Sequence, residues 1–450
     1  MFNSQINGTI VALSTSSMGL GAISVVRMSG EDAIKIASKI FATSKNKKPN
    51  DFEPRKMELG TLTTRSLKDK CLCVVFKAPN SFTGEDIVEF QTHGGSQIAQ
   101  SIVEECIAQG ARMAGNGEFT KRAFLNGKMT LASAEGMMDM INAESAAEVR
   151  AGFDLLGGEL NKIAISAQEE LTDILSEIEV SFDYPEEQIE YITKTNVKNR
   201  LVNISEALEK VLASNQNSGI IKNGIKVLIL GKPNVGKSSL LNRLIGRERA
   251  IVTDIPGTTR DSIEDTFTIN GVKFTCIDTA GIRDSEDKVE QIGVDKAKEQ
   301  VSSADIILFI QDGSKGLDEQ DQEIYDLVQG KNFLIIKNKG DLMTEKSVDD
   351  FIISAASGKG VEELKQLIYN KTVEGKINTN GLIITNNRHI DCLQRAKENI
   401  DHAIMNIEND TLDLTTIDLN LAYSALGEIT GNTSGEDIIN SIFSKFCLGK

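Results

Sequence analysis

The sequence lacks long apolar runs, a basic leader and any excess of positive charge. No stretch approaches the roughly 18 consecutive apolar residues of a membrane-spanning helix. The first 20 residues contain no Lys or Arg, so the basic region of a secretory signal and the arginines of a transit peptide are both missing. These absences predict a cytoplasmic protein with no membrane partner.

Cysteine and histidine are also scarce. The chain has six cysteines, none in a CxxC pair, and three histidines. Such a set favours neither a disulfide framework nor a structural metal site. The net charge of −16 opposes non-specific binding to nucleic acid, because phosphate contacts need Lys and Arg. Any RNA must therefore meet a local basic patch or be held mainly by a partner.

Length and residue pattern predict several domains. A chain of 450 residues exceeds what one hydrophobic core usually serves. Residues 1–118 mix β-rich runs with helical stretches, which indicates an α+β domain. Residues 119–217 show the three and four spacing of packed helices, residues 218–378 follow an α/β pattern, and helical periodicity resumes over 379–450. The simplest architecture is a helical domain interrupted by an inserted α/β domain.

A phosphate-binding loop is the clearest motif. GKPNVGKS, from Gly231 to Ser238, follows a strand-like run and precedes a stretch with helical spacing, which is the context that a P-loop requires. Glycines let backbone N–H groups approach phosphate oxygens, and the N-terminus of the next helix favours negative charge. Lys237 is expected to reach the β and γ phosphates, and the Ser238 hydroxyl to bind Mg²⁺.

Later segments indicate guanine as the base. DTAG at 278–281 and NKGD at 338–341 each end a strand-like run and resemble, in this order, the switch-two and base-specificity motifs of GTPases. The carboxylate of Asp341 can accept hydrogen bonds from guanine N1–H and its 2-amino group, donors that adenine lacks. SAASGKG at 354–360 resembles the last nucleotide motif of these proteins. GTP, not ATP, is the expected ligand.

Hydrolysis needs a group other than the glutamine of Ras-like GTPases, because position 282 is Ile. The P-loop Asn234 and the segment IVTDIPGTTRD at 251–261 resemble the potassium-dependent GTPases. The resemblance implies that K⁺ stands in for an arginine finger by adding positive charge against the phosphates. Its implied ligands are Asn234, Thr253, Ile255 and Thr258.

The same resemblance implies two more roles. Thr259 would be the second residue linked to Mg²⁺, and Glu290 would help to position the attacking water indirectly. Other interpretations stay open: Asn234 could be a loop-stabilising amide, Glu290 could belong to a solvated helix face, and Arg260 or Arg283 could be an internal arginine finger.

Together these motifs define the predicted nucleotide site, in which Lys237 is also a catalytic candidate. Its residues are Asn234, Val235, Gly236, Lys237, Ser238, Ser239, Thr253, Asp254, Ile255, Pro256, Gly257, Thr258, Thr259, Asp278, Thr279, Ala280, Gly281, Asn338, Lys339, Asp341, Ser354, Ala355 and Ala356.

Beyond the GTPase core, essentially the whole chain resembles the MnmE (TrmE) family of tRNA-modifying GTPases. The matching segments are VVRMSG at 25–30, NSFTGEDIVEFQTHGG at 80–95, GEFTKRAFLNGKMTL at 117–131 and the final CLGK, which is similar to the family's CxGK signature. The resemblance implies an α+β folate-binding and dimerisation domain, a discontinuous helical domain and an inserted P-loop GTPase domain of the Ras-like doubly wound type.

The resemblance aligns Arg27, Glu89 and Lys128 with the family's contacts to formyl- or methylene-tetrahydrofolate, with Lys450 or its terminal carboxylate as a further contact. A carboxylate such as Glu89 can accept the paired donors of a pterin ring, and Arg27 and Lys128 suit carboxylates or a formyl oxygen. Cys447 could act as a nucleophile or as a general acid/base during one-carbon transfer.

By resemblance, the protein is a homodimer that joins an FAD-dependent flavoprotein partner in a heterotetramer. The pair would install an aminomethyl or carboxymethylaminomethyl group on C5 of wobble uridine in tRNA, with FAD on the partner. GTP hydrolysis would drive conformational change through dimerisation of the GTPase domains. Two alternatives stay open: a ribosome-assembly GTPase that modifies no base, and a GTPase regulated by a folate-sensing first domain.

Overall fold

The computed structural model describes residues 8–15, 21–183, 194–215, 218–246, 265–277, 294–343, 351–375, 382–409 and 412–449. The chain divides into two compact units. The first unit comprises residues 1–138, 155–208 and 388–450, and the second comprises residues 139–154 and 209–387.

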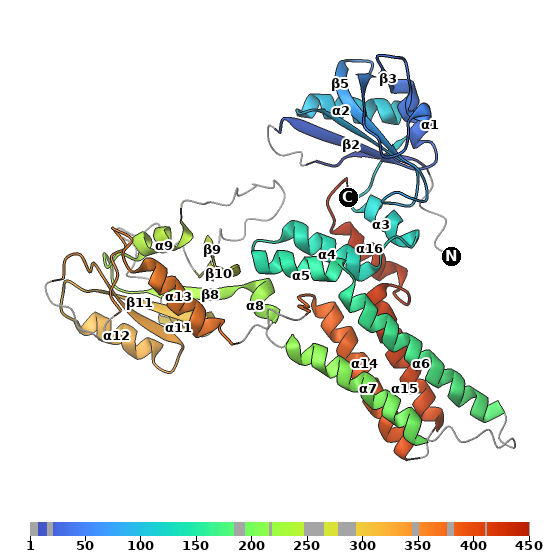
Figure 1. Ribbon diagram of the computed structural model, residues 1–450. Helices are drawn as coiled ribbons and strands as arrows, with labels where there is room; N and C mark the ends of the chain where they lie inside the picture. Colours follow the sequence, from blue (N-terminus) through green and yellow to red (C-terminus); the bar gives the residue numbers. More distant parts are fainter. Residues whose placement is uncertain are drawn as a thin grey trace. The chain divides into compact units, whose positions relative to one another are not determined.

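The N-terminal part of the first unit is a seven-stranded sheet in the order β3-β4-β5-β6-β2-β1-β7 (Figure 1). Neighbouring strands are antiparallel except for β1 and β7, which are parallel. The strands are β1 (Ile10–Leu13), β2 (Ile23–Ser29), β3 (Phe41–Thr43), β4 (Glu58–Thr63), β5 (Lys68–Phe76), β6 (Ile87–His93) and β7 (Arg112–Met113).

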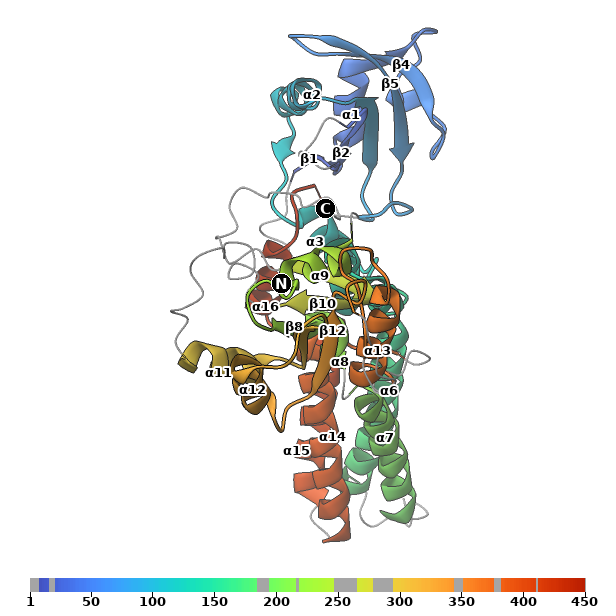
Figure 2. The same cartoon turned by 90° about the vertical axis from the view of Figure 1, so that its left-hand side faces the viewer.

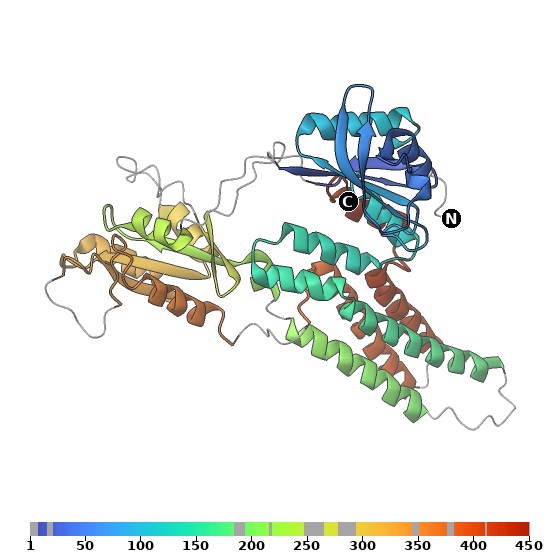
Figure 3. The same ribbon diagram turned by 45° about the horizontal axis from the view of Figure 1, so that its top comes forward.

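Helices α1 (Ala33–Ile40) and α2 (Ser96–Ala108) cover one face of this sheet (Figure 3). Val26 and Met28 of β2 are fully buried in the core between the sheet and these helices. Side chains alternate along a strand, so Arg27 projects from the opposite face. That alternation separates the packing residues of β2 from the one residue predicted to bind a ligand.

The rest of the first unit is helical. Helices α6 (Glu159–Asp183), α7 (Lys194–Ser214), α14 (Asn387–Glu408) and α15 (Leu412–Thr430) run side by side in a bundle (Figures 1 and 2). Leu171, Ile174 and Ile178 recur at helical spacing along α6 and are all buried, as expected of a core-facing stripe. The shorter helices are α3 (Glu118–Leu125), α4 (Leu131–Asn142) and α16 (Glu436–Ser444), whereas most of α5 (Ala146–Leu156) belongs to the second unit.

The second unit contains a five-stranded sheet in the order β12-β11-β8-β10-β9, parallel except for the β9 and β10 pair. Its strands are β8 (Ile225–Leu230), β9 (Asp265–Ile269), β10 (Val272–Cys276), β11 (Ile306–Asp312) and β12 (Phe333–Asn338). Besides α5, its described helices are α8 (Ser218–Asn223), α9 (Lys237–Ile245), α11 (Val294–Ser303), α12 (Glu319–Val328) and α13 (Val361–Thr372).

Helices cover both faces of this second sheet. On β8, Val227 and Ile229 belong to a core shared with α9 and α13, whereas Leu228 packs with Val301 of α11 and Val328 of α12. A strand buried on both faces reads as a continuous apolar run, which is what residues 225–230 show. The doubly wound fold and the interrupted helical domain are thus as predicted, while the proposed boundaries near 118, 217 and 378 stay predictions.

Candidate functional site

The P-loop lies between the end of β8 and the start of α9. Gly236 has φ +98°, and a Cβ atom there would lie 2.2 Å from Nδ2 of Asn338. Only glycine therefore lets the loop and Asn338 approach so closely. Asn234 also adopts a left-handed backbone, with φ 62°, a conformation that asparagine tolerates better than most residues.

Asn338, at the end of β12, joins three of the predicted segments. Its Nδ2 donates to the carbonyl oxygen of Val235 at 2.8 Å, and its Oδ1 accepts the backbone N–H of Ala355 at 2.9 Å. The residue is 3% exposed, so both bonds are shielded from water. The P-loop, NKGD and the 354–360 loop therefore meet at one side chain.

Arg243 on α9 holds the same loop from another side. Its Nε donates to Ala355 O at 3.1 Å and its Nη2 to Ala356 O at 2.6 Å. In a trans peptide the carbonyl and the following N–H point in opposite directions. Fixing the Ala355 carbonyl toward Arg243 therefore turns the Ala356 N–H away from it.

Lys237 lies over the P-loop backbone. Its Nζ donates to the carbonyl oxygens of Gly231 and Lys232, at 2.7 and 2.8 Å. Burial lowers the pKa of Lys237, because desolvation disfavours the charged ammonium. A bound anion would oppose that effect, so this lysine suits a phosphate ligand.

Two carboxylates near the NKGD segment, Asp341 and Asp312, are held ionised by neighbouring groups. A hydrogen bond from the Ser354 hydroxyl lowers the pKa of Asp341, which keeps this carboxylate ionised. The ammonium of Lys339 lies 2.7 Å from Asp312. Burial by itself raises the pKa of Asp312, but hydrogen bonds from Lys339 and Ser314 outweigh it and hold the pKa at about 2.

In the first unit, Arg27 and Glu89 face each other on adjacent strands. The register of β2 and β6 pairs them directly, and Arg27 Nε donates to Glu89 Oε1 at 2.7 Å. The Arg27 guanidinium carbon also lies 5.6 Å from the ring centroid of Phe82 and 5.8 Å from that of Phe119. One carboxylate and two aromatic rings therefore hold this arginine in place.

Lys128 packs against the loop that carries Phe82. A Cβ atom built on Gly84 would lie 3.1 Å from Cε of Lys128. The three predicted folate residues that the structure describes are thus all next to β2, β6 or the loop at residues 80–86.

The C-terminal tail docks on the same sheet. Leu448 forms an antiparallel bridge with Asn116, the Gly117 N–H donates to Cys447 O at 3.3 Å, and the Ser14 hydroxyl donates to Gly449 O at 3.1 Å. A Cβ atom at Gly449, where φ is +90°, would lie 2.2 Å from Leu13 O. Glycine is required there because the tail runs against the end of β1.

The C-terminal thiol differs from the rest of the cysteines. Cys447 is exposed, whereas the other five cysteines are buried. The tail that carries Cys447 runs against the end of β1, and β1 pairs with β2 through Ala12 and Arg27.

Comparisons with known proteins cover nearly the whole chain. Residues 9–128 match a family model described as "GTP-binding protein TrmE N-terminus", and residues 131–447 match one described as "MnmE helical domain". The tRNA modification GTPase MnmE of Clostridioides difficile (strain 630) is 39% identical over 99% of this chain and 100% of that protein. The protein of that name from Thermoanaerobacter pseudethanolicus is 41% identical over 98% of this chain and 99% of that protein.

The chain belongs to the MnmE family of tRNA modification GTPases. Membership confirms the predicted family, the fold class and the GTPase class of enzyme.

Solved structures resemble the chain only in part. The Era complex with MgGDPNP and a 16S ribosomal RNA segment is 28% identical with a TM-score of 0.27, over 39% of this chain and 66% of that one. The FeoB G-domain from Methanococcus jannaschii is 24% identical with a TM-score of 0.24, over 33% of this chain and 97% of that one. Scores this low add no argument to the assignment.

Part of the predicted site of this MnmE-family chain lies outside the described residues. Of the proposed K⁺ ligands only Asn234 is described. Of the two residues predicted to bind Mg²⁺, Ser238 is described and Thr259 is not. The predicted residues outside the described ranges are Thr253, Asp254, Ile255, Pro256, Gly257, Thr258, Thr259, Asp278, Thr279, Ala280, Gly281, Glu290 and Lys450.

Sequence reasoning missed several residues that hold the two sites of this MnmE relative. Arg243 carries no signal beyond being an arginine on the helix that follows the P-loop. Phe82 and Phe119 lie inside the family-like segments, where an aromatic beside acidic residues could have suggested a cation contact.

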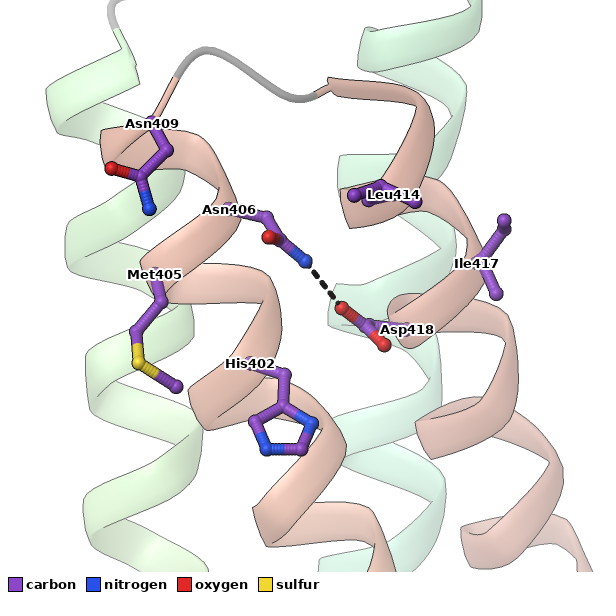
Figure 4. A pocket seen from close by; sticks show the side chains of 7 residues that line it. All are labelled: His402, Met405, Asn406, Asn409, Leu414, Ile417 and Asp418. Atoms are coloured by element: carbon purple, nitrogen blue, oxygen red, sulfur yellow. Dashed lines mark hydrogen bonds between the residues drawn. The ribbon is translucent and has the colours of Figure 1, made fainter.

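A groove elsewhere in this MnmE-family chain has a volume of about 440 Å³. Figure 4 shows it on α14 and α15, where Asn406 Nδ2 donates to Asp418 Oδ2 at 2.7 Å. Its lining residues are His402, Met405, Asn406, Asn409, Leu414, Ile417 and Asp418. None of the predicted site residues within the described ranges lines it, so the groove and the predicted chemistry are separate. Across the described part of the chain, no helix is both long and apolar enough to cross a bilayer.

Proposed function

We propose that this chain is a cytoplasmic, K⁺-stimulated GTPase that helps to install an aminomethyl or carboxymethylaminomethyl group at C5 of wobble uridine in tRNA. It works as a homodimer with an FAD-dependent flavoprotein partner in a heterotetramer, and a formyl- or methylene-tetrahydrofolate supplies the carbon. The observation that carries the proposal is that one chain holds both a P-loop joined through Asn338 to the 354–360 loop and an Arg27–Glu89 pair on the sheet that receives the tail carrying Cys447.

The nucleotide site provides binding and positioning for GTP. The two carbonyl acceptors of Lys237 within the described residues leave one of its three ammonium N–H groups for a phosphate oxygen. Asp341 reads guanine, and the Ala356 N–H, turned away from Arg243, can donate to the base. Ser238 and Thr259 hold Mg²⁺, and Glu290 helps to position water.

The P-loop residue Asn234 fits a potassium site because its amide supplies the oxygen that this hard cation prefers. Thr253, Ile255 and Thr258 are the other proposed ligands. When bound, K⁺ supplies positive charge where negative charge develops on the transferring phosphoryl group.

The Arg27–Glu89 pair gives the folate site both a donor and an acceptor. Glu89 can accept paired donors of a pterin, and Arg27 can donate to an oxygen of the ligand. Lys128 and Lys450 complete the contacts, and Cys447 serves as nucleophile or acid/base in one-carbon transfer.

Dimerisation through the first domain is supported by apolar side chains on the outer face of its sheet. Leu59, Leu72 and Val25 lie in one row across four paired strands, in which Gln91 is the polar member. Leu59 is 54% exposed and Ile23, farther along β2, is 65% exposed. Apolar side chains gathered on one face often mark a protein interface, so a second copy is the proposed cover.

The charge of −16 supports a division of labour in which the flavoprotein supplies much of the tRNA surface. A ribosome-assembly GTPase is disfavoured, because curated tRNA modification GTPases match the chain over 98–99% of its length. GTP hydrolysis drives conformational change by dimerisation of the GTPase domains, and it does not perform the carbon chemistry.

Nucleoside analysis of tRNA from a strain that lacks the gene tests the proposal. The C5 substituent of wobble uridine should disappear, return with the wild-type gene and stay absent with Lys237→Ala. A substituent that persists in the deletion strain would refute the tRNA role.

Cys447→Ser tests whether the first domain is an enzyme or a folate sensor. Full modification with this variant would remove the covalent role of the thiol.

A further inference from the structure

A buried arginine on α3 connects the segments around the Arg27 site. Arg122 is 2% exposed. Its Nη1 donates to both carboxylate oxygens of Glu85, at 3.1 and 2.9 Å. Its Nη2 donates to Glu118 Oε1 at 2.9 Å and to the carbonyl oxygen of Gly8 at 3.0 Å. A charge so deeply buried is tolerated only when it is paired and hydrogen-bonded.

The Glu85 side of this network fixes the loop at residues 80–86. Ser29 Oγ of β2 donates to Glu85 Oε2 at 2.7 Å and lies 2.7 Å from the hydroxyl of Thr83. Asn126 Nδ2 donates to Thr83 O at 2.7 Å. The loop is therefore held from β2, from α3 and from the residue that follows α3, which determines where the Phe82 ring lies beside Arg27.

The Glu118 side fixes the turn at residues 115–117. Glu118 Oε2 accepts the Gly115 N–H at 2.8 Å and a hydrogen bond from Arg112 Nη1 at 2.8 Å. Burial by itself raises the pKa of Glu118, but hydrogen bonds from Arg112, Gly115 and Arg122 outweigh it and bring the pKa to about 2. The carboxylate is thus ionised at neutral pH and pairs with both arginines.

The 115–117 turn receives the C-terminal tail. Asn116 bridges to Leu448 and the Gly117 N–H donates to Cys447 O. Helix α3, which carries Arg122, also carries Phe119, the second ring beside Arg27. One guanidinium therefore connects the loop that carries Phe82 with the turn that holds the backbone of Cys447 and Leu448.

We infer that Arg122 is a positioning residue for the one-carbon site, which fixes the loop at residues 80–86 and the 115–117 turn relative to each other. Arg122 determines where Cys447 lies relative to Arg27. It does not itself contact the proposed folate. Arg122 donates five hydrogen bonds to Glu85, Glu118 and Gly8, more than the three N–H groups of a lysine ammonium can supply, so lysine cannot replace it. The inference rests on the proposed function only for the identity of the ligand, a folate.

Three variants of the full chain test this positioning role. Arg122→Met removes the network, Glu85→Gln weakens only its loop side, and Lys121→Met is the matched control on the same helix, where Lys121 makes an exposed hydrogen bond to Asn440. The first readout is the Kd for 5-formyltetrahydrofolate by calorimetry. The second is the rate at which iodoacetamide alkylates Cys447, the one exposed cysteine among six.

Arg122→Met should weaken folate binding by about tenfold or more, because small misplacements of a preorganised site are costly. It should also speed alkylation of Cys447 several-fold, because the tail loses its fixed turn. Glu85→Gln should shift the Kd in the same direction by less, and Lys121→Met should change neither readout. Circular dichroism establishes that each variant is folded.

A folded Arg122→Met protein with wild-type Kd and wild-type alkylation rate would overturn the inference. If Arg122→Met does not fold, Glu85→Gln provides the test. An unchanged Kd in Glu85→Gln would then contradict the positioning role. If wild-type protein does not bind 5-formyltetrahydrofolate, the proposed folate function fails. The alkylation rates then decide the positioning role alone: equal rates in Arg122→Met and Lys121→Met would refute it.

Discussion

Two properties of Asn234 make it the first residue to test for a role in GTP hydrolysis. Its left-handed backbone, with φ 62°, lies inside the P-loop, and its amide can offer an oxygen to a cation. The Ile at 282 cannot orient water as the glutamine of Ras-like proteins does. The catalytic charge must therefore come from K⁺, from Arg260 or Arg283, or from the partner.

Steady-state GTP hydrolysis in matched KCl and NaCl, with ATP as the control nucleotide, separates these sources. We expect K⁺ to stimulate GTP turnover and Asn234→Ala to reduce the K⁺ rate by about tenfold or more, because charge stabilisation is a large part of phosphoryl transfer. GDP affinity should change little. Equal wild-type rates in the two salts would instead direct attention to the arginines, of which Arg260→Ala is the first to test.

Helix α9 does more than present the P-loop lysine. Its Arg243 donates to two carbonyl groups of the 354–360 loop, so the helix connects the P-loop with the loop predicted to contact the base. We expect Arg243→Met to raise the KM for GTP about threefold to tenfold with kcat nearly unchanged, because each exposed hydrogen bond contributes about 1 kcal/mol. Asn242→Ala, an exposed neighbour on the same helix, is the control. A kcat that falls as far as KM rises would contradict this role.

The difference between predictable and unpredictable parts of the site follows from sequence distance. Residues 231–239 could be predicted because strand, loop and helix are consecutive, and the glycines have local backbone reasons. The contacts of Arg243 with Ala355 and of Arg122 with Glu85 could not be predicted, because they span 112 and 37 residues. Spacing along the chain carries no information on such contacts until the sheets are assembled.

Each of the two units carries a carboxylate that ion pairs and hydrogen bonds keep ionised, Glu135 in the first and Asp312 in the second. In the first unit, Glu135 of α4 pairs with Arg388 and lies 2.7 Å from His389 Nε2, both on α14. Burial alone raises the pKa of Glu135, but hydrogen bonds from His389 and Arg388 outweigh it and lower the pKa to about 2. The pair thus joins a helix from before the inserted domain to one from after it.

Acid should therefore destabilise the first unit. A carboxylate whose folded pKa lies below its ordinary value of about 4.3 stabilises the fold above that value and loses the contribution as pH falls toward 2. We expect Glu135 to contribute about 3 kcal/mol at pH 7 that is lost between about pH 5 and pH 2. Urea unfolding followed across this range measures it.

Glu135→Gln serves as the comparison for that titration. The variant should be less stable at pH 7, because Arg388 loses its anionic partner, and it should show a shallower decline in acid. A decline as steep as that of the wild type would assign the acid sensitivity to other carboxylates, of which Glu118 is the first candidate.

The contact between Ser14 and Gly449 joins residues that are 435 positions apart. The ribosome therefore releases the N-terminal sheet long before it makes the tail that docks on it, and domains generally fold in the order of synthesis. A chain cut before Cys447 would lack the thiol and the bridge from Leu448 to Asn116. One site is thus completed by residues that the ribosome makes 435 positions apart.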